Sequence, residues 1–70
     1  MNLSPKRLIK ILEANGFYLK RMGKGSHHIY YNPDSRITVP VPVHSKDMKK
    51  GTFLGILTDA GIDTSTLEQY

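Results

Sequence analysis

Two adjacent histidines, His27 and His28, carry the side chains of this sequence that are best suited to acid–base chemistry. Histidine has an ordinary pKa of about 6.5, so it can accept and release protons near neutral pH. The pair follows a Gly-Lys-Gly segment at the start of a predicted strand. Because adjacent strand residues point to opposite faces, one imidazole should face outward while the other faces the core or an edge. The neighbouring glycines can shift this phase, so the sequence leaves open which histidine is outside.

The same divergence argues against a metal centre. His27 and His28 would not easily bind one ion, although His44 could join one of them. The chain has no cysteine, and none of its carboxylates has an obvious ligand spacing. The sequence therefore predicts no metal site, and we expect no cofactor.

Positive charge surrounds the two histidines. The chain has ten Lys and Arg against six Asp and Glu, which gives a net charge of +4. All ten bases lie in residues 1–50, which carry +7, whereas residues 51–70 carry −3. Such polarity favours an anionic partner, with nucleic acid as the first candidate; a solvated basic surface is the alternative. The bases that we predict to bind RNA are Lys20, Arg21, Lys24, Lys46, Lys49 and Lys50.

A histidine among cations suits the cleavage of RNA without a metal. RNA carries its own nucleophile, the 2′-hydroxyl, which DNA lacks. A general base removes the 2′ proton, cations stabilise the charge at phosphorus, and an acid protonates the leaving 5′ oxygen. One histidine would supply the base or the acid. Tyr30 and Tyr31 would either stack on bases or pack against neighbouring side chains.

The elements that must position these residues follow the order α-β-β-β-α. Ser4 fits an N-cap, Pro5 fits the first helical position, and Asn15-Gly16 fits a helix stop. Alternation of side chains indicates the strands. The predicted elements are a helix over residues 5–15, strands over 17–22, 26–31 and 36–43, and a helix that starts at Gly51 or Thr52 and ends at Gly61.

Two helices can cover one face of a three-stranded antiparallel sheet and leave the other face wet. We therefore expect an α+β fold like a double-stranded-RNA-binding domain, with residues 1–70 as a single domain. Pro40 and Pro42 lack the N–H that a ladder needs, so pairing of the third strand should stop near Val39 or Pro40. The buried face of the second helix is expected to consist of Phe53, Ile56, Leu57 and Ala60.

The apolar runs and the first residues of the sequence indicate the cellular compartment. No apolar run approaches the ~20 residues of a membrane-spanning helix. The start, MNLSPKRLIK, lacks the apolar core of a secretory signal. We therefore expect a cytoplasmic protein without a membrane partner.

The segment KGSHHIYYNPDSRITVPVPVHSKDMKKGTFLGILTDAGI resembles the HicA (YcfA-like) toxins of bacterial and archaeal toxin–antitoxin pairs. The resemblance runs from about Leu8 to Ile62 and rests on the order and spacing of several short marks. These marks are Gly16-Phe17, Gly25-Ser26-His27-His28, Pro33-Asp34, Thr38-Val39-Pro40, Val43-His44, Lys50-Gly51-Thr52, Ile56-Leu57 and Ala60-Gly61.

The resemblance implies a small mRNA interferase that cleaves RNA without a metal and is inhibited by a HicB-type antitoxin encoded alongside. It implies a catalytic role for His27, with His28 as second choice, because some members keep only the second histidine. Gly25 would let the backbone approach RNA closely, and Ser26 belongs to the same motif. The antitoxin would cover His27 and the basic surface, and the free toxin is expected to be monomeric.

The second predicted helix departs from the family because residues 53–60 carry no Lys or Arg. Its RNA contacts would then come from the three lysines before it, and Leu54 would be available to the antitoxin. Two other readings stay open at this point. One is a non-catalytic RNA-binding module of the same fold, and the other is a protein whose only partner is another protein.

Overall fold

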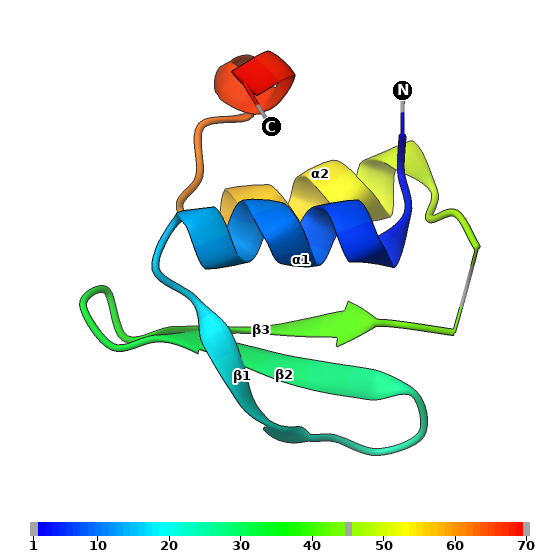
Figure 1. Ribbon diagram of the computed structural model, residues 1–70, viewed down its shortest axis with the longest axis vertical. Coiled ribbons are helices and arrows are strands. Elements are labelled where there is room, and N and C mark those ends of the chain that lie inside the picture. Colours follow the sequence, from blue (N-terminus) through cyan, green and yellow to red (C-terminus); the bar gives the residue numbers. More distant parts are fainter. Residues whose placement is uncertain (1, 45, 70) are drawn as a thin grey trace.

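The computed structural model describes residues 2–44 and 46–69, and its elements follow the predicted order α-β-β-β-α (Figure 1). A short 3-10 helix, η1, comes after them. The elements are α1 (Pro5–Ala14), β1 (Tyr18–Met22), β2 (His27–Asn32), β3 (Ile37–Pro42), α2 (Lys50–Asp59) and η1 (Thr64–Gln69).

Helix α1 begins and ends as its local sequence predicts. The Ser4 hydroxyl accepts a hydrogen bond from the Arg7 backbone N–H at 3.2 Å, which satisfies one of the free donors of the first turn. Pro5 follows at the first helical position, where its missing N–H costs no hydrogen bond. After Ala14 the chain reverses through Gly16, whose φ of +90° favours glycine.

The three strands form one antiparallel sheet in the order β1-β2-β3. Strand β1 does not keep the strict alternation that the sequence predicts. Its register against β2 shifts between Leu19 and Arg21, which leaves Lys20 as the extra residue of a bulge. The bulge places Arg21 opposite Ile29, while Lys20, just before it, has no residue of β2 directly opposite.

The expectation that the prolines end the pairing of β3 was wrong. Pairing continues through Pro40, opposite Ile29, to Pro42, opposite His27. The Val43 N–H then donates to the Ser26 carbonyl at 3.0 Å, so odd-numbered residues of β3 direct their N–H groups toward β2. Both prolines therefore occupy positions whose N–H would point away from the ladder, where proline removes no bond of the sheet.

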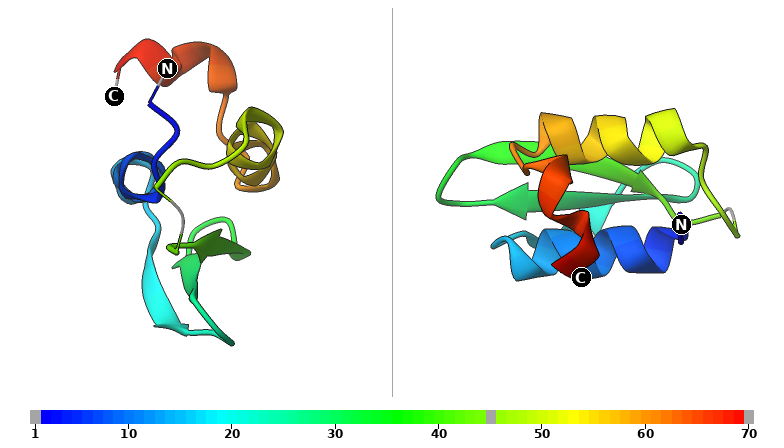
Figure 2. Two further views of the ribbon diagram at one scale, coloured as in Figure 1. Left: turned by 90° about the vertical axis from the view of Figure 1, so that its right-hand side faces the viewer. Right: turned by 90° about the horizontal axis from the view of Figure 1, so that it is seen from above.

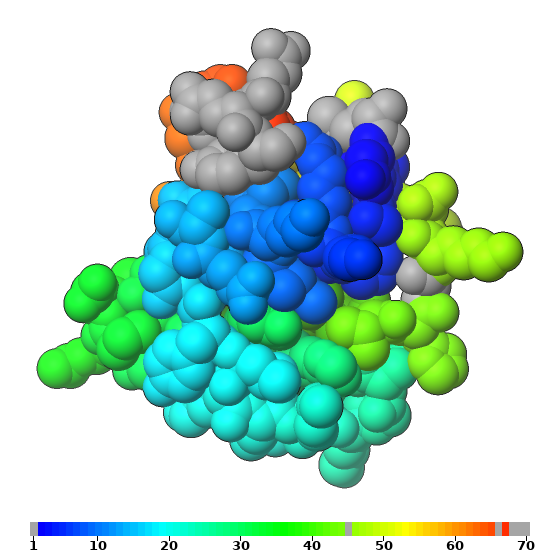
Figure 3. All heavy atoms as spheres, viewed as in Figure 1, coloured from blue at the N-terminus to red at the C-terminus, as the bar shows by residue number. Residues whose placement is uncertain are grey.

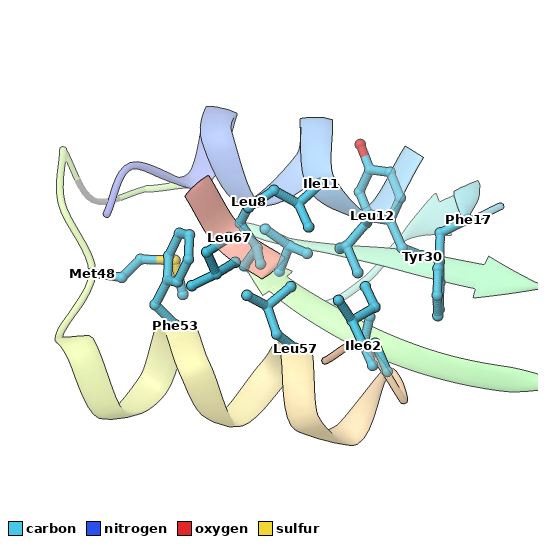
Figure 4. Close-up of a cluster of buried hydrophobic side chains, with 13 residues drawn as sticks. Leu8, Ile11, Leu12, Phe17, Tyr30, Met48, Phe53, Leu57, Ile62 and Leu67 are labelled. Atoms are coloured by element: carbon cyan, nitrogen blue, oxygen red, sulfur yellow. The ribbon is translucent and has the colours of Figure 1, made fainter. Parts of the chain in front are cut away.

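Helices α1 and α2 lie side by side on one face of the sheet, as predicted (Figure 2). Helix η1 lies on the side of the helices that faces away from the sheet (Figure 2). The core is the layer between helices and sheet, where Leu8, Phe53 and Val41 are fully buried (Figure 4). Burial of each such side chain contributes roughly 1.5–3 kcal/mol, so this layer is the main source of stability.

The buried face of α2 agrees with the sequence at Phe53, Leu57 and Ala60, whereas Ile56 is only half-buried. Helix α2 starts at Lys50, one or two residues before the predicted start at Gly51 or Thr52, and Gly61 lies just beyond its end with a φ of +76°.

Three core residues lie outside the two predicted helices and the three predicted strands, and these are Met48, Ile62 and Leu67. Met48, in the segment before α2, and Leu67, in η1, are both buried against the helices (Figure 4). The Met48 N–H donates to the Leu3 carbonyl at 2.9 Å, and an Arg7 guanidinium nitrogen donates to the Leu67 carbonyl at 3.1 Å. These bonds attach the loop before α2 and the end of the chain to the start of α1.

Tyr30 supplies a test of this packing. Burial raises the pKa of its phenol, and the charge of Glu13 adds to the rise. The folded protein therefore favours the neutral phenol. The contribution of Tyr30 to stability should be constant at neutral pH and fall once the pH exceeds about 10, where the phenol of an unfolded chain ionises. We expect the free energy of unfolding, measured by urea denaturation, to fall more in the wild type than in Tyr30→Phe from about pH 9 to about pH 11.

Tyr31→Phe is the matched control, because the ring of Tyr31 points to the opposite face of the sheet. Equal alkaline losses in the wild type and Tyr30→Phe would contradict the buried phenol.

Candidate nucleic-acid interface

Strand β2 separates the two histidines onto opposite faces of the sheet. Tyr30 is buried beneath the helices, and His28, two residues before it, points to the same side and is half-buried. Asn32, two residues after Tyr30, confirms this phase, because its amide donates to the Asn15 carbonyl at the end of α1 at 3.1 Å. His27 therefore points away from the helices, and it is exposed. The structure thus answers the question that the sequence left open.

The imidazole of His27 is oriented by its own turn. Its Nδ1 lies 3.3 Å from the carbonyl oxygen of Lys24. A carbonyl can only accept, so in the neutral ring Nδ1 carries the proton of this hydrogen bond and Nε2 keeps the free lone pair. The turn is closed by a second bond, from the Gly23 N–H to the His27 carbonyl at 2.7 Å. The result is an exposed imidazole whose Nε2 is ready to accept a proton.

Gly25 lies at the top of this turn and has a φ of +62°. Apart from atoms of Gly25 itself and of its two chain neighbours, no atom lies within 4 Å of the position that a Cβ would take. The residue is therefore required by its backbone conformation and not by crowding within the protein. The same open space leaves the turn backbone accessible, as the proposed approach to RNA needs.

Two of the predicted RNA-binding bases share the outer face with His27. Arg21 pairs with Ile29, which points outward between His27 and Tyr31. The Lys20 ammonium lies 4.6 Å from the centroid of the Tyr31 ring, so Lys20 also reaches this face. Both bases are exposed, as is Lys24 in the turn beside them. Figure 3 shows β1 and this turn, in cyan and teal, as the lower surface of the molecule.

The remaining predicted bases lie around the loop from β3 to α2. This loop leaves the sheet beside Ser26, whose carbonyl accepts from Val43, so it starts at the same end of the sheet as the histidine turn (Figure 1). Lys46 is exposed in the loop, Lys49 is the N-cap of α2, and Lys50 is its first residue.

The structure thus brings the predicted site residues together as two groups. An outer-face group consists of Lys20, Arg21 and His27, and an end group consists of Lys24, Gly25, Ser26, Lys46, Lys49 and Lys50. The Cα atoms of the molecule extend over 27 Å along the longest axis.

Sequence reasoning missed one residue of the outer face and left another undecided. Tyr30 packs in the core, whereas Tyr31 points outward. Tyr18, which was assigned no role, contacts Tyr31 edge to face, with 5.9 Å between ring centroids. The signal that could have found Tyr18 is the antiparallel pairing of Tyr18 with Tyr31, which requires the strand register.

The described parts of the chain contain no group of three or more His, Cys, Asp or Glu that could hold a metal ion. Within residues 2–44 and 46–69, no helix is long and apolar enough to cross a membrane.

Comparison with known proteins gives a family match. A family model described as the HicA toxin of bacterial toxin–antitoxin systems matches residues 5–62. A search of curated proteins finds no match to the chain. The matched range includes both helices, the sheet and every residue of the two groups, and only η1 lies beyond it.

The backbone of the histidine turn gives a prediction on stability. Gly25→Ala should lower the free energy of unfolding by about 1 kcal/mol or more, because φ of +62° brings a Cβ against the backbone. Gly25→Asn should lose less, since asparagine tolerates this region. Urea denaturation followed by circular dichroism measures both.

Gly55→Ala is the matched control. Gly55 lies inside α2 with open space around it, so the same substitution should stabilise the protein by roughly 0.5–1 kcal/mol. A Gly25→Ala protein as stable as the wild type would show that the turn does not need glycine.

Proposed function

The chain belongs to the HicA toxin family, and on that premise we propose that it is the toxin of a HicA/HicB-like pair. In this proposal residues 1–70 act as one domain and the free toxin as a monomer. It is a metal-independent endoribonuclease, an mRNA interferase, that inhibits translation in the cytoplasm. A HicB-type antitoxin neutralises it by covering His27 and the basic groups around it.

The proposed reaction uses the 2′-hydroxyl of the RNA as nucleophile. The 2′ oxygen forms a bond to phosphorus while its proton passes to a general base. The bond from phosphorus to the 5′ oxygen breaks, and an acid protonates that oxygen. The products are a 2′,3′-cyclic phosphate and a 5′-hydroxyl. No water is consumed in this step, and no metal takes part in it.

The observation that carries the proposal is the exposed imidazole of His27. Its Nδ1 faces the Lys24 carbonyl at 3.3 Å, which leaves Nε2 as the basic nitrogen and favours the role of general base. In this proposal a water molecule from solvent donates a proton to the leaving 5′ oxygen, and the hydroxide that remains takes back the proton that His27 accepted, so no water is consumed overall. His28 is half-buried on the side of the helices, so it is the second choice.

The exposed lysines at the end of the sheet that carries the histidine turn would hold the phosphates of the RNA. Lys24 lies in the histidine turn, and Lys46 lies in the loop that leaves the sheet beside Ser26. Lys49 and Lys50 flank the first backbone N–H groups of α2, and the side chain of Lys49, the N-cap residue, makes no capping hydrogen bond to them. Free N–H groups at a helix N-terminus favour an anion, and the two ammonium groups add to that preference.

Removal of the His27 imidazole should abolish most of the activity. We expect His27→Ala to cleave RNA in EDTA roughly 10²- to 10⁴-fold more slowly than the wild type, the range of general acid–base catalysis. Gel electrophoresis of a labelled RNA measures the rate. His28→Ala serves as the comparison and should retain more activity than His27→Ala.

An RNA with 2′-deoxyribose at the cut site should stay intact, because it lacks the nucleophile. Equal cleavage by His27→Ala and the wild type would remove His27 from the mechanism. Intact RNA after long incubation with the wild type, together with salt-sensitive binding, would favour a non-catalytic RNA-binding module.

The phosphate-binding role of α2 gives a prediction on salt dependence. Lys49→Ala and Lys50→Ala should each weaken RNA binding and reduce the slope of log affinity against log salt by about 0.7, the value for one phosphate of a single strand. Fluorescence anisotropy at several salt concentrations measures the slope. Lys10→Ala, which removes the same charge from the exposed side of α1, should leave it nearly unchanged. Identical slopes for all three variants would contradict a specific role for α2.

A further inference from the structure

The open face of the sheet carries an aromatic pair that stability does not explain. The rings of Tyr18 and Tyr31 meet edge to face at 5.9 Å and 85°. Tyr18 is 49% exposed, and neither ring belongs to the core, which on this strand uses Tyr30. Both rings instead lie on the face that the helices leave open, and this is the face to which His27 points.

Positive charge accompanies the rings, and the bulge in β1 adds a second basic residue to it. The Lys20 ammonium lies 4.6 Å from the centroid of Tyr31. The shifted register places Arg21 opposite Ile29, so this guanidinium is directed to the same face. Two consecutive basic residues thus lie beside two aromatic rings on one face. A strictly alternating strand would direct the two basic side chains to opposite faces.

We propose that Tyr18 and Tyr31 form a stacking platform for the bases of single-stranded RNA, with Lys20 and Arg21 on the adjacent phosphates. This inference rests on the proposed function and gives its substrate a strand requirement. Every base has a π face that can stack on an aromatic ring, whereas the bases of a duplex are already stacked on each other. Lys20 already covers the Tyr31 ring, so an arriving base takes its place and the ammonium turns to the phosphate.

The position of the platform relative to His27 fits this role. Tyr31 lies four residues after His27 on the same face of β2, which corresponds to about 13 Å along the strand. A base on the platform therefore belongs to a nucleotide near the cleaved bond and not to the reacting ribose itself. The platform would hold a single strand along β2 with its scissile phosphate beside the imidazole.

The test is binding of an RNA that cannot be cut. The probe is a fluorescein-labelled, single-stranded 2′-O-methyl oligonucleotide of mixed sequence, which lacks the nucleophile and so separates binding from catalysis. We expect Tyr18→Ala and Tyr31→Ala each to weaken its binding roughly 5- to 140-fold, the loss that corresponds to one stacked base. Tyr18→Phe and Tyr31→Phe keep the ring and should bind like the wild type.

Two further probes separate stacking from charge. A strand of equal length and charge without bases, and the same sequence as a duplex, should bind the wild type and Tyr18→Ala equally well. Leu19→Ala is the control variant, because Leu19 is 42% exposed on the same strand but pairs with Tyr30 on the other face. Tyr18 is exposed enough that its loss should leave the fold intact, which circular dichroism checks.

Unchanged affinity of Tyr18→Ala and Tyr31→Ala for the single strand would overturn the platform and leave the proposed nuclease standing. An equal loss for the strand without bases, or for the duplex, would also overturn it. Absence of RNA binding by the wild type at low salt would overturn the platform and the proposed function together.

Discussion

The phase of β2 is the constraint on which both faces of the molecule depend. A strand has a period of two, so one buried side chain determines the direction of every other. Tyr30 is that side chain, held beneath the helices, and Asn32 secures the same phase through its bond to α1. A slip of one residue would expose Tyr30 and turn His27 toward the core. The free energy that buries Tyr30 therefore also holds His27 in solvent.

The bulge in β1 and the prolines of β3 adjust the two edges of the sheet without disturbing this phase. The bulge adds Arg21 to the outer face, although its neighbour Lys20 already reaches that face. Pro40 and Pro42 occupy positions whose N–H would point away from the sheet, so β3 offers few donors to a further strand. In β1, by contrast, all five residues are exposed. The exposed parts of the sheet are therefore the edge formed by β1 and the face opposite the helices.

The sequence predicted the helices and the order of elements well because those signals are local. The Ser4 cap, Pro5 and the stop at Gly16 act within one turn of the residues that they affect. The errors arose where distant segments decide the outcome. Pairing past Pro40 depends on which way each N–H points, and the register shift at Lys20 depends on β2.

The same distinction applies to the core and to the candidate site. Met48 and Leu67 are buried only because loop and tail return to α1, which no periodicity reveals. The motif that contains His27 could be read directly, whereas the burial of Tyr30 was needed to decide which of His27 and His28 is exposed. Tyr18 could not be found at all without its partner across the strands.

The two histidines of the motif are neighbours in sequence but point to opposite faces of the sheet. His27 is exposed, and its Nδ1 faces the Lys24 carbonyl of its own turn, whereas His28 is half-buried and pairs with Val41 on the side of the core. To exchange them, β2 would have to shift by one residue against both neighbours and expose Tyr30. Under the proposed mechanism, reactivity is thus assigned by packing on the opposite face of the sheet. The outer residues add little to that packing, so under the same proposal a change there alters RNA binding while the fold stays intact.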